Sequence, residues 1–252
     1  MTGKTHRVGG VVGCLVGYSL LVSKGLLVKE VEPLVQLCIM YPFAIYGSTV
    51  QDMDHGWQSV PSRDLVSWCL WRVLHLTTNR RAKLKEKWKK HPKPKNSFGG
   101  KVRRFRYWVL GIFDAKHRSW QTHSDLFVLF IMWLLHLTIT CLEGTINGLI
   151  LNMVVIGLLC GVLSHCFLDL LTPDGLHSVV MWFLNKTMSV GDGKLHLVPK
   201  SKFFSSVSVD KDGNPKESAW EYCTRKVLWL AGFILLVRVL YILSPYRFEL
   251  NL

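Results

Sequence analysis

The chain has 252 residues, of which 49% are hydrophobic, and it carries a formal net charge of +14. This apolar composition excludes an ordinary soluble enzyme. A helix that crosses a bilayer needs about 20 mostly apolar residues, and five segments meet or approach this length: residues 9–28, 33–50, 126–142, 146–171 and 227–243. The sequence therefore predicts an all-α integral membrane protein with about five transmembrane helices in a single polytopic domain, residues 1–252.

The first two segments leave alternatives open. The first has a basic flank, but no clear small-residue cleavage site follows it, so we interpret it as a retained span and not as a secretory signal. The second is short and contains Pro42. If it is re-entrant, the chain crosses the membrane four times.

The positive charge is concentrated in one stretch. Residues 78–106 contain thirteen Lys or Arg residues and one acid, Glu86, which gives the stretch a charge of +12. The positive-inside rule places such a segment in the cytoplasm. Counting the spans outward from it predicts that the N-terminus and residues 172–226 are cytoplasmic too.

This basic stretch has three interpretations. The simplest is a solvated and mobile loop, interrupted by Pro92 and Pro94, that fixes the orientation of the protein. The second is attraction to anionic lipid headgroups, at roughly 1 kcal/mol per basic residue near the surface. The third is nucleic-acid binding, which no recognisable DNA-reading motif supports.

Shorter elements are expected outside the spans. Residues 62–76 and 176–184 are rich in apolar side chains, including tryptophan, and predict amphipathic helices that lie along the interface. Residues 194–212 alternate between apolar and polar side chains and predict a small β-hairpin, with turn-forming residues at positions 212–215.

The strongest single motif is a histidine and an aspartate at the end of the fourth span. His165 and Asp169 are four residues apart, so on a helix they share one face and can reach one metal ion. Alternatively, Asp169 does not bind the metal but hydrogen-bonds to the His165 ring and fixes its tautomer. A third possibility is that the pair forms a polar contact between helices. An ionisable pair near the end of a span is costly unless it is paired or functional.

Other groups able to bind metals flank the remaining spans. Asp52, Asp54 and His55 come directly after the second span, and two carboxylates beside an imidazole suit a divalent ion. His117, Arg118 and His123 precede the third span, where the arginine is suited to hold an oxyanion. His6 precedes the first span. Taken alone, each group can equally be interpreted as ordinary surface residues that bind no metal.

The predicted topology brings all of these groups to one face of the membrane. No P-loop, HExxH, nucleophile elbow or dinucleotide fingerprint is present. The chemistry implied is therefore attack by a metal-activated water.

The order of these motifs resembles that of the YdjM family, LexA-regulated inner-membrane proteins described as metal-dependent hydrolases. The family pattern corresponds here to four elements. They are Thr5-His6; Gly47-Ser48 with Gln51-Asp52-Met53-Asp54-His55; His117-Arg118 with Thr122-His123-Ser124; and residues 161–169 with Thr172 and Gly175. A late glycine-x-x-x-glutamate element corresponds to Gly213 and Glu217.

Three departures from the family pattern stand out. Gln51 replaces a proline, one extra residue separates His117 from His123, and the basic insert is longer. The His-x-x-x-Asp spacing is also distantly similar to that of zinc-dependent phospholipase C and of the single-strand-specific zinc nucleases.

Together, the residues and the resemblance predict a multi-pass inner-membrane hydrolase with a cytoplasmic N-terminus. It would hold one to three divalent metal ions, zinc in the first place and manganese as the alternative. Its expected substrate is a phosphoester such as a phospholipid or lipid-linked phosphate. The alternative is a non-enzymatic membrane protein with a structural His/Asp cluster and a basic loop that recruits a partner or anionic lipid. The expected metal ligands are His6, Asp52, His123, His165 and Asp169, with Asp54, His55, His117 and Arg118 as catalytic residues.

Overall fold

The computed structural model describes most of the chain. The described residues are 3–27, 31–54, 65–91, 97–112, 114, 122–141, 145–188, 194–198, 205, 207–209 and 215–243. They form two compact units, one of residues 1–51 and 123–252 and the other of residues 52–122.

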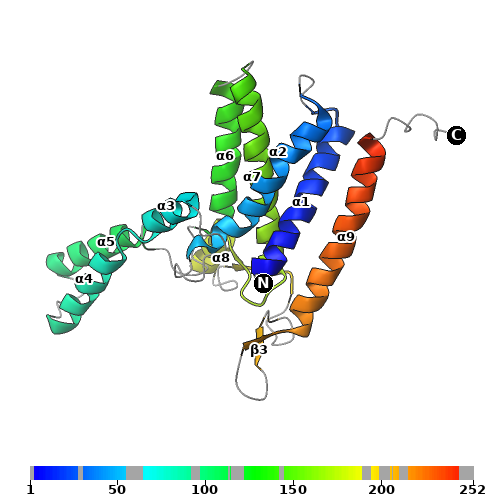
Figure 1. Ribbon diagram of the computed structural model, residues 1–252. Coiled ribbons are helices and arrows are strands. Elements are labelled where there is room, and N and C mark those ends of the chain that lie inside the picture. Colours follow the sequence, from blue (N-terminus) through cyan, green and yellow to red (C-terminus); the bar gives the residue numbers. More distant parts are fainter. Residues whose placement is uncertain are drawn as a thin grey trace. The chain divides into compact units, whose positions relative to one another are not determined.

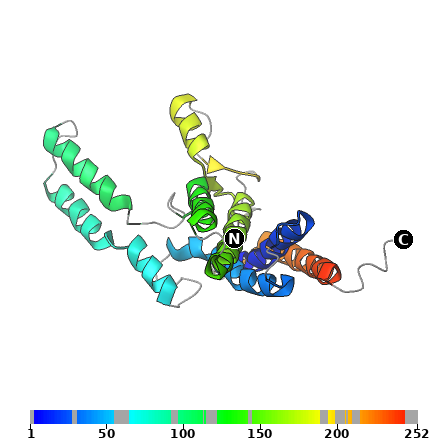
Figure 2. The same cartoon turned by 90° about the horizontal axis from the view of Figure 1, so that it is seen from above.

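The first unit is a bundle of long apolar helices (Figure 1). α7 packs against α1, α2 and α6, and α1 also packs against α2 and α9. Viewed from above, α9 lies at the α1 side of the bundle (Figure 2). These helices are α1 (Gly3–Ser23), α2 (Pro33–Val50), α6 (Asp125–Cys141), α7 (Ile146–Leu170) and α9 (Ala219–Leu243).

Among the described residues, four helices are long and apolar enough to cross a membrane: α1, α2, α7 and α9. The fifth predicted span is α6, an apolar helix of 17 residues, at the lower limit of the usual range. The outward face of α9 carries exposed Leu230, Ile234 and Val237, as expected for a helix in contact with lipid. The predicted all-α membrane fold is confirmed.

Small residues allow the helices of the bundle to approach closely. A Cβ atom on Gly157 of α7 would lie 2.5 Å from the carbonyl oxygen of Met40 in α2. A Cβ atom on Gly161 would overlap the carbonyl oxygen of Ala44. On α1, a Cβ atom on Gly13 would lie 2.7 Å from the Cys160 carbonyl oxygen. Such contacts between backbones are a main source of helix association in lipid, where the hydrophobic effect does not drive it.

The segment after α7 is a strand followed by a helix. Gly175 adopts φ of +63°, which reverses the chain. β1 (Leu176–His177) then pairs antiparallel with β2 (Lys194–Leu195), and α8 (Val179–Met188) follows β1. The prediction of a helix beginning at residue 176 is wrong at its start, because the backbone of residues 176 and 177 bonds to neighbouring segments instead.

A β-hairpin is present, but its strands differ from those predicted. β3 (Val207–Val209) pairs antiparallel with β4 (Pro215–Glu217), with Val207 opposite Glu217. β2 belongs to the other sheet, since its partner is β1. Of the described residues in the predicted range 194–212, residues 207–209 form a strand of the hairpin, whereas residues 194 and 195 pair outside the range. Alternation indicates a strand, but it does not identify the strand's partner.

The second unit is helical. It contains α3 (Leu65–Leu74), α4 (Thr78–Lys90) and α5 (Phe98–Ile112), and η1 (Gln51–Asp54) leads into it from α2. α3 confirms the amphipathic helix expected near residues 62–76. The prediction of a mobile loop is wrong for residues 78–90 and 98–106, which are helical, because Lys, Arg, Leu and Glu are good helix formers even when they are highly charged. Residues 92–96 lie outside the described residues.

α4 and α5 form an antiparallel pair (Figure 1). Arg81 of α4 bonds to Asp114 at 2.8 Å, and its guanidinium lies 4.2 Å from the centroid of the Tyr107 ring in α5. The Thr77 hydroxyl donates to the Leu110 carbonyl. These contacts join the start of α4 to the end of α5.

Candidate metal centre

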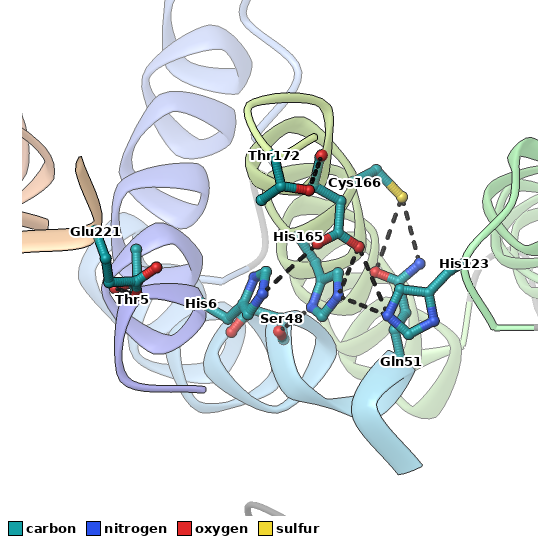
Figure 3. A network of polar contacts seen from close by, with 10 residues as sticks. Thr5, His6, Ser48, Gln51, His123, His165, Cys166, Thr172 and Glu221 are labelled. Carbon is teal, nitrogen blue, oxygen red and sulfur yellow. Dashed lines mark hydrogen bonds and ion pairs between the residues drawn. The ribbon is translucent and has the colours of Figure 1, made fainter. Parts of the chain in front are cut away.

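Four of the predicted metal ligands meet at one end of the bundle. His6 lies in the first turn of α1, His123 just before α6, and His165 and Asp169 in the last turns of α7. All four side chains are buried, each with 1% or less of its surface exposed. Figure 3 shows the ring of His165 between those of His6 and His123. The predicted convergence of these residues is therefore present in the first unit.

The Asp169 carboxylate is close to all three imidazoles. Its Oδ2 lies 3.3 Å from His165 Nε2 and 3.6 Å from His123 Nε2, while its Oδ1 lies 3.9 Å from His6 Nε2. The Nε2 atoms of His165 and His123 are 3.2 Å apart. The His6 and His165 rings stack with centroids 3.7 Å apart. The Nε2 atoms of three histidines thus surround one carboxylate.

A backbone carbonyl orients His165. The Nδ1 atom of His165 lies 2.6 Å from the carbonyl oxygen of Ser48 near the end of α2. A carbonyl can only accept a hydrogen bond, so Nδ1 carries the proton and donates it. In the neutral ring, Nε2 is then left with its lone pair directed at Asp169 and His123, which is the arrangement typical of a metal-bound histidine.

The short sheet fixes the backbone of His123. The N–H of His177 in β1 donates to the carbonyl oxygen of His123 at 3.1 Å, and Ser124 forms a β-bridge with His177. The Ser178 hydroxyl donates to Asp125 at 2.9 Å. His177 therefore supports His123 through its backbone.

A glutamate that sequence reasoning missed lies on the far side of His6. Glu221 is fully buried at the start of α9 and accepts a hydrogen bond from Thr5, the residue before His6. The Ser218 hydroxyl accepts from the N–H of Glu221, a serine N-cap of α9. A signal was present, because Ser218-x-x-Glu221 before an apolar run is a capping-box pattern.

Glu217, the family-pattern glutamate, has a different role. Its carboxylate forms a bidentate ion pair with Arg225, with one N–O distance of 3.0 Å. It is also about a third exposed. Glu217 therefore stabilises the start of α9 through its ion pair with Arg225. Unlike Glu217, Glu221 is fully buried.

Gln51, which stands where the family has proline, is also buried beside the cluster. Its side-chain amide donates to the Sγ atom of Cys166 at 3.3 Å. Cys166 follows His165 in the sequence. Asp52 follows Gln51 and is buried as well.

Four predicted catalytic groups cannot be compared with this geometry. His55, His117 and Arg118 lie outside the described residues, and Asp54 is described only as the last residue of η1. Of the two histidines before α6, His123 is the one found in the cluster.

The cluster fits a divalent metal. Tetrahedral zinc binds nitrogen and oxygen ligands at about 2.0–2.2 Å, which places neighbouring ligand atoms roughly 3.3–3.6 Å apart. The distances of 3.2, 3.3 and 3.6 Å among His165, His123 and Asp169 are close to these values. One ligand atom each of His6, His165 and Asp169 also lies within 4.8 Å of the others. A buried carboxylate is costly without a compensating cation, which a metal would supply.

Comparison with known proteins agrees with the motif order. No curated protein and no solved structure matches the chain, so the distant likeness to zinc-dependent phospholipase C is unsupported. A match to the family described as YdjM inner membrane protein covers residues 1–246, almost the whole chain. The residues of the candidate metal centre all lie within this match. The chain therefore belongs to the YdjM family of inner membrane proteins.

Proposed function

We propose that this protein is a membrane-embedded, metal-dependent hydrolase. The observation that carries the proposal is the buried set of His6, His123, His165 and Asp169, with the Nδ1 of His165 held by the Ser48 carbonyl. A purely structural cluster does not need three imidazole Nε2 atoms around one carboxylate. This donor set is that of a zinc site, with manganese as the alternative metal.

The chain's own residues supply the remaining chemistry. Bound there, a divalent metal would act as a Lewis acid and lower the pKa of a water molecule toward neutrality. In this proposal Asp52, the carboxylate that follows Gln51 in the sequence, adds a further ligand. In this proposal Asp54 or His55 accepts the proton of the attacking water. Arg118, with His117, holds the anionic substrate.

An apolar groove in the bundle favours a lipid substrate. A cavity of about 240 Å³ lies between α1, α2 and α9, and on α1 it runs from Val8 to Leu15. Leu37 of α2 and Phe233 of α9 also line it. Residues two apart on a helix point to nearly opposite sides, so the groove lies on the other face of α1 from His6. There it offers an apolar surface to an acyl or prenyl chain. We propose hydrolysis of a phosphoester in a phospholipid or lipid-linked phosphate, because carboxylate-bound metals suit the developing charge of phosphoryl transfer.

Metal content tests the centre. Full-length protein purified in detergent should carry near-stoichiometric zinc or manganese by elemental mass spectrometry, and His165→Ala with Asp169→Ala should lose it. His136→Ala is the matched control, since this histidine is exposed in the middle of α6. Folded and active wild-type protein that contains no metal would refute the proposal.

A substrate panel tests the reaction. The purified protein, loaded with zinc or manganese, is incubated with phospholipids, polyprenyl phosphates, single-stranded DNA and acyl esters. Turnover of a lipid phosphoester should stop with EDTA and with Asp169→Ala. Turnover of acyl esters alone would exclude the phosphoester substrate but not the hydrolase. Stoichiometric metal without any turnover would favour the non-enzymatic alternative.

A further inference from the structure

The second unit has a cationic groove of its own. A cavity of about 530 Å³ lies between α4 and α5. Four basic side chains line it: Arg80, Lys83 and Lys87 from α4, and Arg106 from α5. Leu84, Phe105, Val109 and Leu110 form its apolar part. Positions 80, 83 and 87 lie on one face of a helix, so the groove follows from the sequence spacing once α4 forms.

These four cations have no neutralising acid in the part of the chain that the structure describes. Arg81, on another face of α4, is paired with Asp114, and Glu86 is paired with Lys90 at 3.0 Å. Neither carboxylate lines the groove. Like charges held around one cavity repel each other, and an anion that enters it relieves this repulsion.

An exposed apolar stripe runs along α5 next to the groove. Phe98 exposes 83% of its surface and Phe105 63%, and Val102 and Trp108 are exposed on the same side. Their spacing of four, three and three residues places them along one side of the helix. Lys101 and Arg104 are basic neighbours in the same helix. Apolar and aromatic side chains flanked by basic ones are the pattern of a helix that lies in a membrane interface.

We propose that the α4–α5 hairpin binds an anionic phospholipid of the surrounding bilayer. The phosphate lies among Lys83, Lys87 and Arg106, and the stripe of Phe98, Val102, Phe105 and Trp108 lies among the acyl chains. Phe105 belongs to both the groove and the stripe, so one amphiphile can occupy both.

Two further observations select a lipid over nucleic acid or a protein. The chain belongs to a family of inner membrane proteins, and the unit is joined through the sequence to α2 at one end and α6 at the other. A nucleic-acid duplex would use the cations but leave the aromatic stripe in water, and a single strand, whose bases can stack on aromatic side chains, is a competitor in the test below. This site is independent of the metal centre, and its test does not require activity.

Lipid binding by the full-length protein tests the proposal. Native mass spectrometry measures binding of phosphatidylglycerol and phosphatidylcholine to protein purified in detergent. A groove variant carries Lys83→Gln, Lys87→Gln and Arg106→Gln. Since each basic residue contributes about 1 kcal/mol near an anionic surface, the groove variant should bind phosphatidylglycerol roughly 10- to 100-fold more weakly.

A matched variant removes the same charge elsewhere on the hairpin. Lys85→Gln, Lys89→Gln and Lys90→Gln are exposed positions of α4 that do not line the groove, and this variant should retain most of the affinity. Phosphatidylcholine should bind weakly to every form. Circular dichroism checks that both variants keep their helices.

Three results would overturn the proposal. Equal losses in the two variants would mean that only overall charge matters. Equal affinity for both lipids would exclude recognition of an anionic headgroup. Inorganic phosphate or a single-stranded oligonucleotide that binds the groove as tightly as phosphatidylglycerol does would show that the occupant is not a lipid.

Discussion

At the scale of single residues, a hydroxyl joins the candidate metal centre to the last helix. Thr5 precedes the candidate ligand His6 and donates a hydrogen bond to Glu221 of α9. Both residues are fully buried. Nearby, the Trp220 ring N–H donates to the Leu171 carbonyl at 3.1 Å, which joins α9 to the end of α7. The start of α9 thus supports the two helices that carry His6, His165 and Asp169.

We predict that Thr5→Val destabilises the protein. The valine is similar in shape but cannot donate to Glu221, so a buried carboxylate loses one partner, at a cost of about 1–3 kcal/mol. Metal retention should weaken too, because groups behind a ligand set its orientation. Thermal unfolding in detergent and metal content measure the two effects. Thr5→Ser keeps the hydroxyl and is the control; equal stability of the valine and serine variants would contradict the role of the bond.

The candidate site could be predicted from sequence where a motif carries it. His165 and Asp169 follow from a four-residue spacing on a helix, and His6 and His123 from their positions beside apolar segments. Ser48 is part of the family pattern, but its role could not be predicted, because it acts through a backbone carbonyl that any residue has. Glu221 is 216 residues from Thr5 in the sequence, and only the fold shows that they meet.

At the scale of helices, the centre depends on how closely α2 and α7 approach. A Cβ atom on Gly161 would overlap the Ala44 carbonyl and lie 2.6 Å from the Ser48 backbone nitrogen. Gly161 is one turn before His165, and Ser48 is the residue whose carbonyl holds the His165 ring. The same small residue therefore allows both the helix contact and the hydrogen bond.

We predict that Gly161→Ala destabilises the protein by about 1–3 kcal/mol, since backbone atoms cannot yield as a flexible side chain can. Gly232→Ala in α9 is the matched control. There the new methyl would meet Val12 at an ordinary 3.4 Å, and the expected change is within about 0.5 kcal/mol. Unfolding in detergent, followed by circular dichroism, measures both. Equal effects would mean that the α2–α7 approach is not tight.

Hydropathy alone predicted the long helices well, because a span in lipid must satisfy its own backbone. The surface elements were harder. Residues 78–106 have no clear apolar period and were expected to be a loop, although most of their side chains favour a helix. β1 and β2 are two residues each and pair over 16 intervening residues. Strands this short leave no periodic signal. Their pairing also needs a glycine at position 175, where a Cβ atom would lie 2.5 Å from the Leu195 carbonyl oxygen.

At the scale of the whole chain, the predicted orientation rests on the positive charge of residues 78–106 and on the alternation of the spans. Within the first unit, the start of α1, the end of α2 and the start of α6 meet the end of α7 at the cluster. The turn after α1, with Gly25 at φ of +63°, lies at the other end of α1. If the bundle spans the membrane, Lys4 and Lys24 therefore face opposite compartments.

We predict that single cysteines at positions 4, 85 and 194 are labelled only from the cytoplasm, and one at position 24 only from outside. The native residues there are all lysines, and Lys4, Lys24 and Lys85 are exposed. The background replaces the seven native cysteines with alanine and must retain metal as wild type does. A membrane-impermeant maleimide on intact and opened cells measures the labelling. Labelling of positions 4 and 24 from one side would mean that α1 does not cross the bilayer. Labelling of position 85 from outside would remove the charge argument for a cytoplasmic centre. It would also place the cationic groove against the outer leaflet.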